Sequence, residues 1–200
     1  MTLHSTIMVE MNFVPEAPLI PTLTGERVVL RPVRLEDAAD VFRVFSDPAA
    51  MRYWSTPPMS SPADATGLIE DILGRQAQGD FFQWGVVKAG SDSLIGTCTL
   101  FQIVREHLRA EVGFILRSDL WGMGLAREAI TLMLAHAFDT LGLHRLEADT
   151  DPRNERCLGL LKRLGFQEEG RLRERWHVDG EVQDSVLLGL LSGEWGRGPR

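Results

Sequence analysis

The first third of the chain alternates one short apolar run with two amphipathic segments. Residues 27–33 are apolar with polar ends, which predicts a strand. Residues 36–45 carry apolar side chains at helical spacing, and residues 61–78 follow as a second helix. Ser61 is a favoured N-cap, and Pro62 suits the first helical position because its missing N–H would have no partner there.

The middle of the chain predicts three consecutive strands and then a long helix. Residues 81–88 and 94–104 flank a turn rich in Gly, Ser and Asp, which is typical of a β-hairpin. Residues 111–116 form the next strand. Residues 122–141 carry the strongest helical pattern, with one continuous apolar stripe, and Gly142 ends this helix.

Strands and helices alternate toward the C-terminus. Residues 145–150 predict a strand, and a helix whose apolar face includes Cys157 follows the turn at residues 151–154. Residues 166–177 and 182–190 predict a last hairpin around an Asp-Gly turn. Hairpin strands followed by strand-helix-strand-helix indicate an α/β (α+β) fold with a mixed sheet covered by helices.

Length and composition are those of a globular domain. The chain has 200 residues, of which 44% are hydrophobic and 24% charged. We expect one domain over residues 22–192, between an N-terminal extension (1–21) and a C-terminal tail (193–200). The formal net charge of -7 argues against a nucleic-acid partner and favours a cationic substrate.

Metal, secretion and membrane signals are missing from the sequence. Its two cysteines, Cys98 and Cys157, and its five histidines show no metal-ligand spacing, so we predict no metal site. Residues 1–21 lack a basic stretch followed by an apolar one. No run approaches the ~18 apolar residues that span a bilayer. We therefore expect a cytoplasmic protein with reduced thiols that does not bind membranes.

A glycine-rich turn joins the strand at residues 111–116 to the long helix. A strand that delivers glycines to the first turn of a helix leaves N–H groups unpaired and uncrowded, which favours an anion. The turn has no Gly-Lys-Ser/Thr of a nucleotide-binding loop, and Arg127 occupies the last glycine position of a dinucleotide motif. We interpret the turn as a pyrophosphate site.

The order of elements and four segments resemble the GNAT superfamily of N-acetyltransferases, in particular its ribosomal-protein alanine acetyltransferase (Rim) branch. The segments are residues 27–32, 110–114 and 121–129, and an Asn154-x-x-Cys157 motif that leads to residues 164–170. The resemblance implies a mixed, mostly antiparallel seven-stranded sheet, splayed between strands four and five and flanked by about four helices.

The resemblance also implies acetyl-CoA as cosubstrate. The family's pyrophosphate signature, Gln/Arg-x-x-Gly-x-Gly/Ala, falls on Trp121-x-x-Gly124-x-Ala126, with Trp in place of Gln or Arg. Backbone groups of Phe114 and Leu116 would pair with the pantetheine arm, as a peptide adds to a strand edge. The other residues implied to bind CoA are Gly122, Met123, Leu125, Arg117, Arg127 and Asn154.

Two residues are candidates for proton transfer. Glu111 shares one strand face with Gly113 and Ile115, and in the Rim branch such a Glu suits a general base acting through water. A salt-bridged carboxylate at a strand end is the alternative. Cys157 stands where relatives have a Ser that donates to the departing sulfur, although a small core residue is the alternative. We expect Asp184, on the last hairpin, to fix that hairpin instead of taking part in proton transfer.

The acceptor would be a primary amine, either a small molecule or a protein N-terminus, attacking the thioester directly in a ternary complex. Tyr53, Trp54 and Trp84 are candidates for the acceptor pocket. The last hairpin and the N-terminal arm are candidate contacts of a homodimer. The alternative function is a non-catalytic acyl-CoA-binding sensor or scaffold, since no tyrosine occupies the acid position found in other members.

Overall fold

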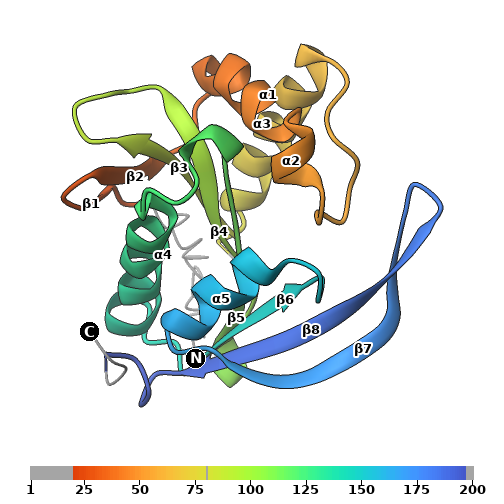
Figure 1. Ribbon diagram of the computed structural model, residues 1–200. Helices are drawn as coiled ribbons and strands as arrows, with labels where there is room; N and C mark the ends of the chain where they lie inside the picture. The colour runs from red at the N-terminus through yellow and green to blue at the C-terminus, as the bar shows by residue number, and fades with distance from the viewer. Residues whose placement is uncertain (1–19, 80, 197–200) are drawn as a thin grey trace, which may run out of the picture.

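The computed structural model describes residues 20–79 and 81–196, so most of the predicted N-terminal extension lies outside the described residues. Its centre is one eight-stranded mixed sheet with the order β1-β2-β3-β4-β5-β6-β8-β7 (Figure 1). The only parallel pair among the described strands is β5 with β6. The strands are β1 (Leu23–Thr24), β2 (Val28–Pro32), β3 (Phe82–Lys88), β4 (Leu94–Val104), β5 (Arg109–Leu116), β6 (Arg145–Thr150), β7 (Gln167–Val178) and β8 (Glu181–Leu191).

Helices cover both faces of the sheet (Figure 1). Three of them, α1 (Ala38–Phe45), α2 (Pro48–Met51) and α3 (Pro62–Gln76), pack on one face around a core that includes Val44, Ile69 and Leu94. The other face carries α4 (Leu125–Ala135), which continues as a π-helical turn (His136–Thr140), and α5 (Glu155–Arg163). No helix within residues 20–79 and 81–196 is long and apolar enough to cross a membrane.

The predicted class, the mixed sheet and the element order are confirmed, with three corrections. The sheet has eight strands, because two residues of β1 pair with Val29 and Leu30 of β2. A fifth helix, α2, forms because the Asp47 carboxylate accepts the N–H of Ala49 and caps it. The long helix begins at Leu125, three residues later than expected, because the preceding glycines adopt positive φ angles.

The sheet is splayed where the predicted fold requires it. β5 and β6 pair only through Arg109–Glu111 against Arg145–Glu147 and then diverge. The N–H of Arg117 donates to the Ile95 carbonyl on the β4 side, at 3.0 Å. Because backbone groups alternate along a strand, those of Phe114 and Leu116 face the side of β6. The second half of β5, residues 112–116, therefore presents backbone groups toward a gap instead of toward a neighbouring strand.

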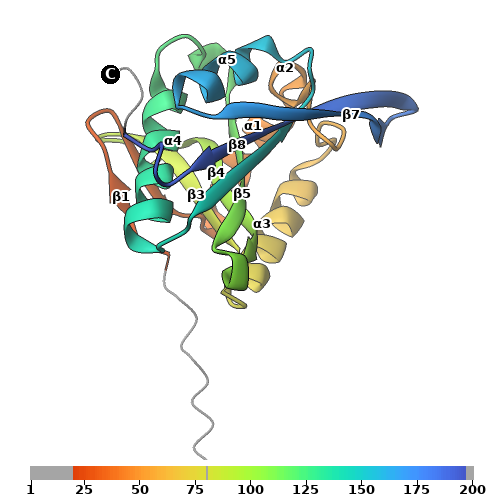
Figure 2. The ribbon, with the colours of Figure 1, turned by 90° about the horizontal axis from the view of Figure 1, so that it is seen from below.

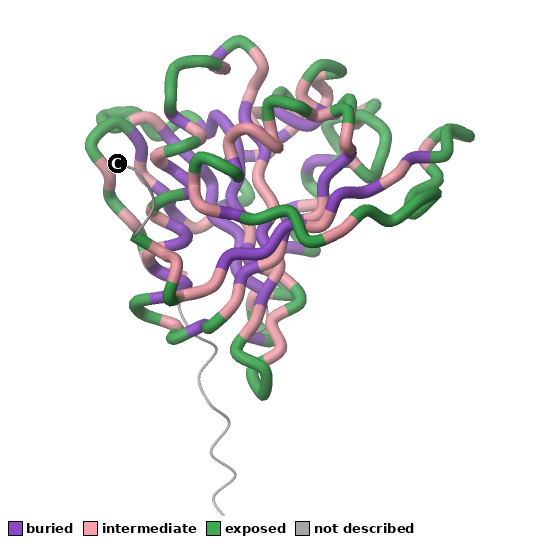
Figure 3. Tube along the Cα trace, turned by 60° about the horizontal axis from the view of Figure 1, so that its bottom comes forward, coloured by how far each residue is buried: buried purple, intermediate pink, exposed green. Residues whose placement is uncertain are grey.

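The β7–β8 hairpin extends beyond the body of the molecule (Figure 2). The tip of the hairpin is exposed, and β7, an edge strand, has exposed side chains on both faces, whereas Gln183 and Ser185 of β8 are buried (Figure 3). The Asp184 carboxylate accepts from the Arg171 guanidinium at 2.7 Å and from the Glu174 N–H at 2.9 Å. The prediction that Asp184 fixes this hairpin is confirmed.

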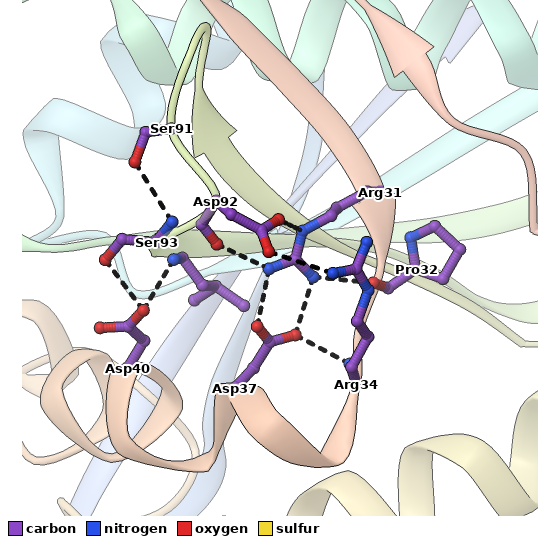
Figure 4. Close-up of polar contacts among 9 residues, drawn as sticks. Arg31, Pro32, Arg34, Asp37, Asp40, Ser91, Asp92 and Ser93 are labelled. Carbon is purple, nitrogen blue, oxygen red and sulfur yellow. Dashed lines mark hydrogen bonds and ion pairs between the residues drawn. The ribbon is translucent and has the colours of Figure 1, made fainter.

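A buried ion pair holds α1 against the sheet (Figure 4). The Arg31 guanidinium on β2 donates to both carboxylate oxygens of Asp37, at 2.8 and 2.7 Å, and both side chains are almost completely buried. Arg31 also contacts Asp92 in the β3–β4 turn, at 2.8 Å, and the Asp37 carboxylate accepts the N–H of Arg34. One guanidinium thus joins β2, the turn before α1 and the β3–β4 turn.

We expect Asp37→Asn to lower the free energy of unfolding by about 2 kcal/mol at neutral pH. Removing one partner of a buried pair costs ~3–5 kcal/mol, and here Asp92 retains part of the compensation. Burial raises the pKa of Asp37, but the hydrogen bonds and charge of Arg31 outweigh it, so the folded-state pKa is lowered. The stability that Asp37 contributes is therefore fully present above its pKa in the unfolded state. It is lost as the pH falls through its pKa in the folded state.

Urea denaturation at several pH values measures this effect. The matched control is Asp71→Asn, which removes an exposed carboxylate that lies 3.8 Å from Arg75 on α3. Such surface pairs contribute about 0–1 kcal/mol. Equal losses in the two variants would contradict the role given to Asp37.

Candidate active site

The predicted glycine turn forms an open row of backbone donors at the start of α4. Gly122 and Gly124 have φ angles of +78° and +76°, which glycine adopts without steric cost. The first helical bond runs from the Glu128 N–H to the Gly124 carbonyl, at 3.2 Å. Across the part of the chain that the structure describes, the N–H groups of residues 122–127 have no acceptor. The turn and the helix dipole therefore favour an anion at this point.

The residues of the turn that are predicted to bind CoA, 122–126, lie together here, and their environments differ. Leu125 is buried in the core below α4, whereas Met123 is 53% exposed at the tip of the turn. A Cβ added at Gly122 would meet no atom within 4 Å, so the space in front of the turn is open. Ala126 is half-buried and packs against the core.

Arg27 braces the turn from behind, a role that local sequence patterns do not reveal. Its guanidinium donates to the carbonyl of Met123 at 3.0 Å and to that of Gly124 at 3.4 Å. The Glu128 carboxylate accepts from the Arg27 Nε at 2.9 Å and from the Arg27 N–H at 2.7 Å. Because Arg27 holds the carbonyls of Met123 and Gly124, it stabilises the turn in the conformation that leaves the N–H groups of the turn free.

The two arginines predicted to pair with phosphate differ in their environments. Arg117 forms a bidentate ion pair with Asp119, at 3.0 and 2.7 Å, so its charge is shared with a carboxylate. Arg127 is exposed and has no ion-pair partner in the described ranges. Arg127 is therefore the more available cation of the two.

Trp121 connects the turn to the end of β5. Its indole N–H donates to the Leu116 carbonyl at 2.9 Å. That carbonyl, one of the groups predicted to pair with pantetheine, thus already accepts one hydrogen bond within the protein. The backbone of Phe114, two residues earlier on the same side of β5, faces the gap.

Glu111 lies at the last residue pair before β5 and β6 diverge, and it borders a cavity of about 230 Å³. Its carboxylate forms no ion pair or hydrogen bond with any residue that the structure describes, so the salt-bridged alternative is wrong. The neighbouring carboxylates are all paired with arginines. The cavity is lined by Glu111, Arg145, Glu147, Ala148, Asp149, Glu169, Leu172, Arg175, Leu187 and Leu188.

The surroundings of Glu111 make its carboxylate more basic. Burial is the largest cause that raises its pKa, and the charges of Glu147 and Asp149 raise it further. Arg175 and Arg109 act in the opposite direction without cancelling the effect. A carboxylate with a raised pKa is a better proton acceptor near neutral pH.

Asn154 and Cys157 lie at the start of α5. The side-chain oxygen Oδ1 of Asn154 accepts the N–H of Cys157 at 3.2 Å and caps the helix, so the N–H groups of the side-chain amide are the part left for a ligand. Burial raises the pKa of the Cys157 thiol to about 11. The thiol therefore stays protonated at neutral pH. Its side chain packs against the main core, as the alternative prediction has it.

Of the three aromatic residues predicted for the acceptor pocket, Trp84 is a correction. It is fully buried, stacks on Phe82 with ring centroids 5.9 Å apart, and donates its indole N–H to the Pro21 carbonyl. It has no surface to offer an acceptor. Tyr53 and Trp54 are half-buried beyond α2, and Tyr53 lies 5.8 Å from the guanidinium of Arg153 in the turn before α5.

Comparison with known proteins is consistent with this geometry. Residues 27–167 match the family described as Acetyltransferase (GNAT) domain. The chain is 34% identical to the uncharacterized N-acetyltransferase p20 of Bacillus licheniformis, over 87% of this chain and 98% of that protein. It is 29% identical to the ribosomal protein uS5 alanine N-acetyltransferase of Escherichia coli, over 86% and 92% of the two chains.

Two further similarities cover most of the chain. Identity to the spermidine N(1)-acetyltransferase of Escherichia coli is 27%, over 86% of this chain and 90% of that protein. The structure of Mycobacterium smegmatis RimJ in complex with CoA-disulfide shares the fold, with a TM-score of 0.81 at 24% identity over 90% and 91% of the chains.

Proposed function

Because the chain belongs to the GNAT family of acetyltransferases, we propose that it transfers the acetyl group of acetyl-CoA to a primary amine by direct attack in a ternary complex. The observation that carries this proposal is the junction of two features at one end of the sheet. The row of free N–H groups at residues 122–127 lies at the end of β5, and the second half of β5 faces the gap beside β6.

The donor would be held by backbone groups. The pyrophosphate of acetyl-CoA would accept hydrogen bonds from the turn, where glycines leave it room, and Arg127 would add charge. The pantetheine arm would then pair with the free edge of β5 at Phe114, in the manner of an added strand. This arrangement would bring the thioester close to the point where β5 and β6 separate, which is where Glu111 lies.

The reaction requires one proton transfer. A neutral amine attacks the thioester carbonyl carbon, the C–S bond breaks, and CoA leaves as a thiolate. Glu111 would accept the proton of the amine, directly or through one water, because its carboxylate is unpaired within the described residues and has a raised pKa. Cys157 would offer no more than a weak S–H hydrogen bond to the departing sulfur.

The cavity beside Glu111 would take the acceptor amine. Four carboxylates and two arginines line it, so a protonated amine that approaches finds one unpaired negative charge at Glu111. Relatives act on a small polyamine or on a ribosomal protein, as their names state. Both classes present a primary amine, which is the common requirement of this site.

Release of free thiol tests the proposed activity. We expect thiol to appear when the protein is mixed with acetyl-CoA and any productive amine, and its rate to depend on amine concentration. A panel of spermidine, an alanine-starting peptide and free amino acids covers the two acceptor classes. If acetyl-CoA binds tightly but no amine releases thiol, the sensor or scaffold function is favoured instead.

A further inference from the structure

Trp121 is a fixed aromatic surface next to the glycine turn. It occupies the place where the family's signature has Gln or Arg, so this chain lacks the polar side chain at that position. Its indole N–H is bonded to the Leu116 carbonyl, which holds the ring in one orientation. The half-buried ring also packs against the main core.

Arg156, in the first turn of α5, lies over this ring. Its guanidinium carbon is 5.1 Å from the centroid of the Trp121 ring, within the range of a cation–π contact. α5 lies on the same face of the sheet as α4 (Figure 1), and the contact joins α5 to the turn that precedes α4. Arg156 is exposed and forms no ion pair with the described part of the chain.

Three other arginines near this end of the sheet are engaged, whereas Arg127 in the turn itself has no ion-pair partner among the described residues. Arg117 is paired with Asp119, Arg27 with Glu128, and Arg153 with Asp151 and Glu181. A guanidinium held over an aromatic ring by a cation–π contact still has N–H groups that can donate to another acceptor. Arg156 is thus a cation held next to the turn, and its N–H groups have no acceptor among the residues that the structure describes.

We propose that Arg156 binds the pyrophosphate of CoA from α5, with Trp121 as the platform that positions its guanidinium. The inference rests on the proposed function, because it assumes CoA in the turn. Trp121 replaces the polar residue of the signature, and Arg156 supplies the lost donor from a different helix. The pyrophosphate would then be bound by the backbone of α4 on one side and by a side chain of α5 on the other.

Calorimetric titration of CoA tests this assignment. We expect Arg156→Met to raise the Kd for CoA about tenfold, the loss of one charge-assisted contact to phosphate. Arg163→Met removes an exposed arginine two turns further along α5 and is the matched control, with an unchanged Kd. Trp121→Leu should weaken CoA binding too, and Arg156→Met should add little to it, because the platform is already lost.

Ligand fragments identify the contacted group. Dephospho-CoA retains the pyrophosphate, so the tenfold effect of Arg156→Met should persist with it, and pantetheine, which has no phosphate, should show no effect. An effect that disappears with dephospho-CoA would overturn the pyrophosphate assignment, as would equal Kd values for CoA in the wild type and Arg156→Met. Failure of the proposed function looks different, because it would appear as the absence of thiol release with every amine tested, whatever Kd values for CoA the variants show.

Discussion

The substitution Gly124→Glu is expected to abolish acetyl-CoA binding while the protein remains folded. Gly124 has a φ angle of +76°, and a Cβ there would lie 3.2 Å from the Arg27 guanidinium that braces the turn. A carboxylate at this position would also bring negative charge to the place proposed for the pyrophosphate. Steric strain, a displaced brace and charge repulsion all act against the same ligand, so calorimetry should detect no binding.

A second glycine separates loss of the site from loss of stability. Gly142 has a φ angle of +66°, is exposed, and has nothing within 4 Å of an added Cβ. Gly142→Glu therefore introduces the same charge and a similar backbone strain of about 1 kcal/mol, but beyond the opposite end of the long helix. It should lower the thermal midpoint about as much as Gly124→Glu and still bind acetyl-CoA. If both variants bind equally well, the turn is not the pyrophosphate site.

The second large effect is expected from Glu111→Gln. If Glu111 accepts the proton of the amine, its loss should lower kcat by about 10²-fold near neutral pH, the lower end of what a positioned base contributes. The deficit should shrink as the pH rises toward the pKa of the amine, about 10.4 for a lysine-like amine, because the neutral amine then forms without help. Since glutamine is nearly isosteric, binding of acetyl-CoA should not change.

Rates measured across a pH series give the decisive comparison. Glu168→Gln on β7 is the control, because it removes the same charge from an exposed carboxylate paired with Lys162 and does not line the cavity. It should follow the wild-type profile. A Glu111→Gln enzyme whose pH–rate profile has the wild-type shape would exclude Glu111 as the base and leave the carboxylate an electrostatic role.

Local patterns were sufficient to predict most of the elements. β4 and β6 have the predicted bounds, because each is an apolar or alternating run between residues that favour turns. The bulky apolar stripe of the long helix also lies in the core as predicted, through Ile130, Met133 and Leu134. In these segments the side chains that make the pattern are the ones that make the contacts.

Features that depend on contacts distant in sequence were missed. The period of β3 does not reveal that both of its faces are covered, so the sequence leaves Trp84 a candidate for the acceptor pocket although it is in the core. The brace from Arg27 joins residues about a hundred positions apart. The contact of Arg156 with Trp121 depends on how the fold brings the start of α5 to the turn before α4.

The surroundings of Glu111 in the cavity also depend on contacts between residues that are distant in sequence. Glu111 was a candidate from its place in a motif, but the carboxylates that raise its pKa belong to a strand that follows a whole helix later. The parallel pairing of β5 with β6 places Glu111 opposite Glu147. A spacing rule within one segment cannot predict this juxtaposition, because it is created by the crossover connection.

The brief pairing of β5 with β6 also couples ligand occupancy to the integrity of the sheet. Three residue pairs hold these two strands together at the seam between the two halves of the sheet. A ligand arm that hydrogen-bonds to β5 along the gap would act as an additional strand there. Because a ligand that binds only the folded state stabilises it, the free energy of unfolding would rise as acetyl-CoA saturates the protein. The bound cosubstrate would thus complete the sheet at a position where the chain itself supplies no strand.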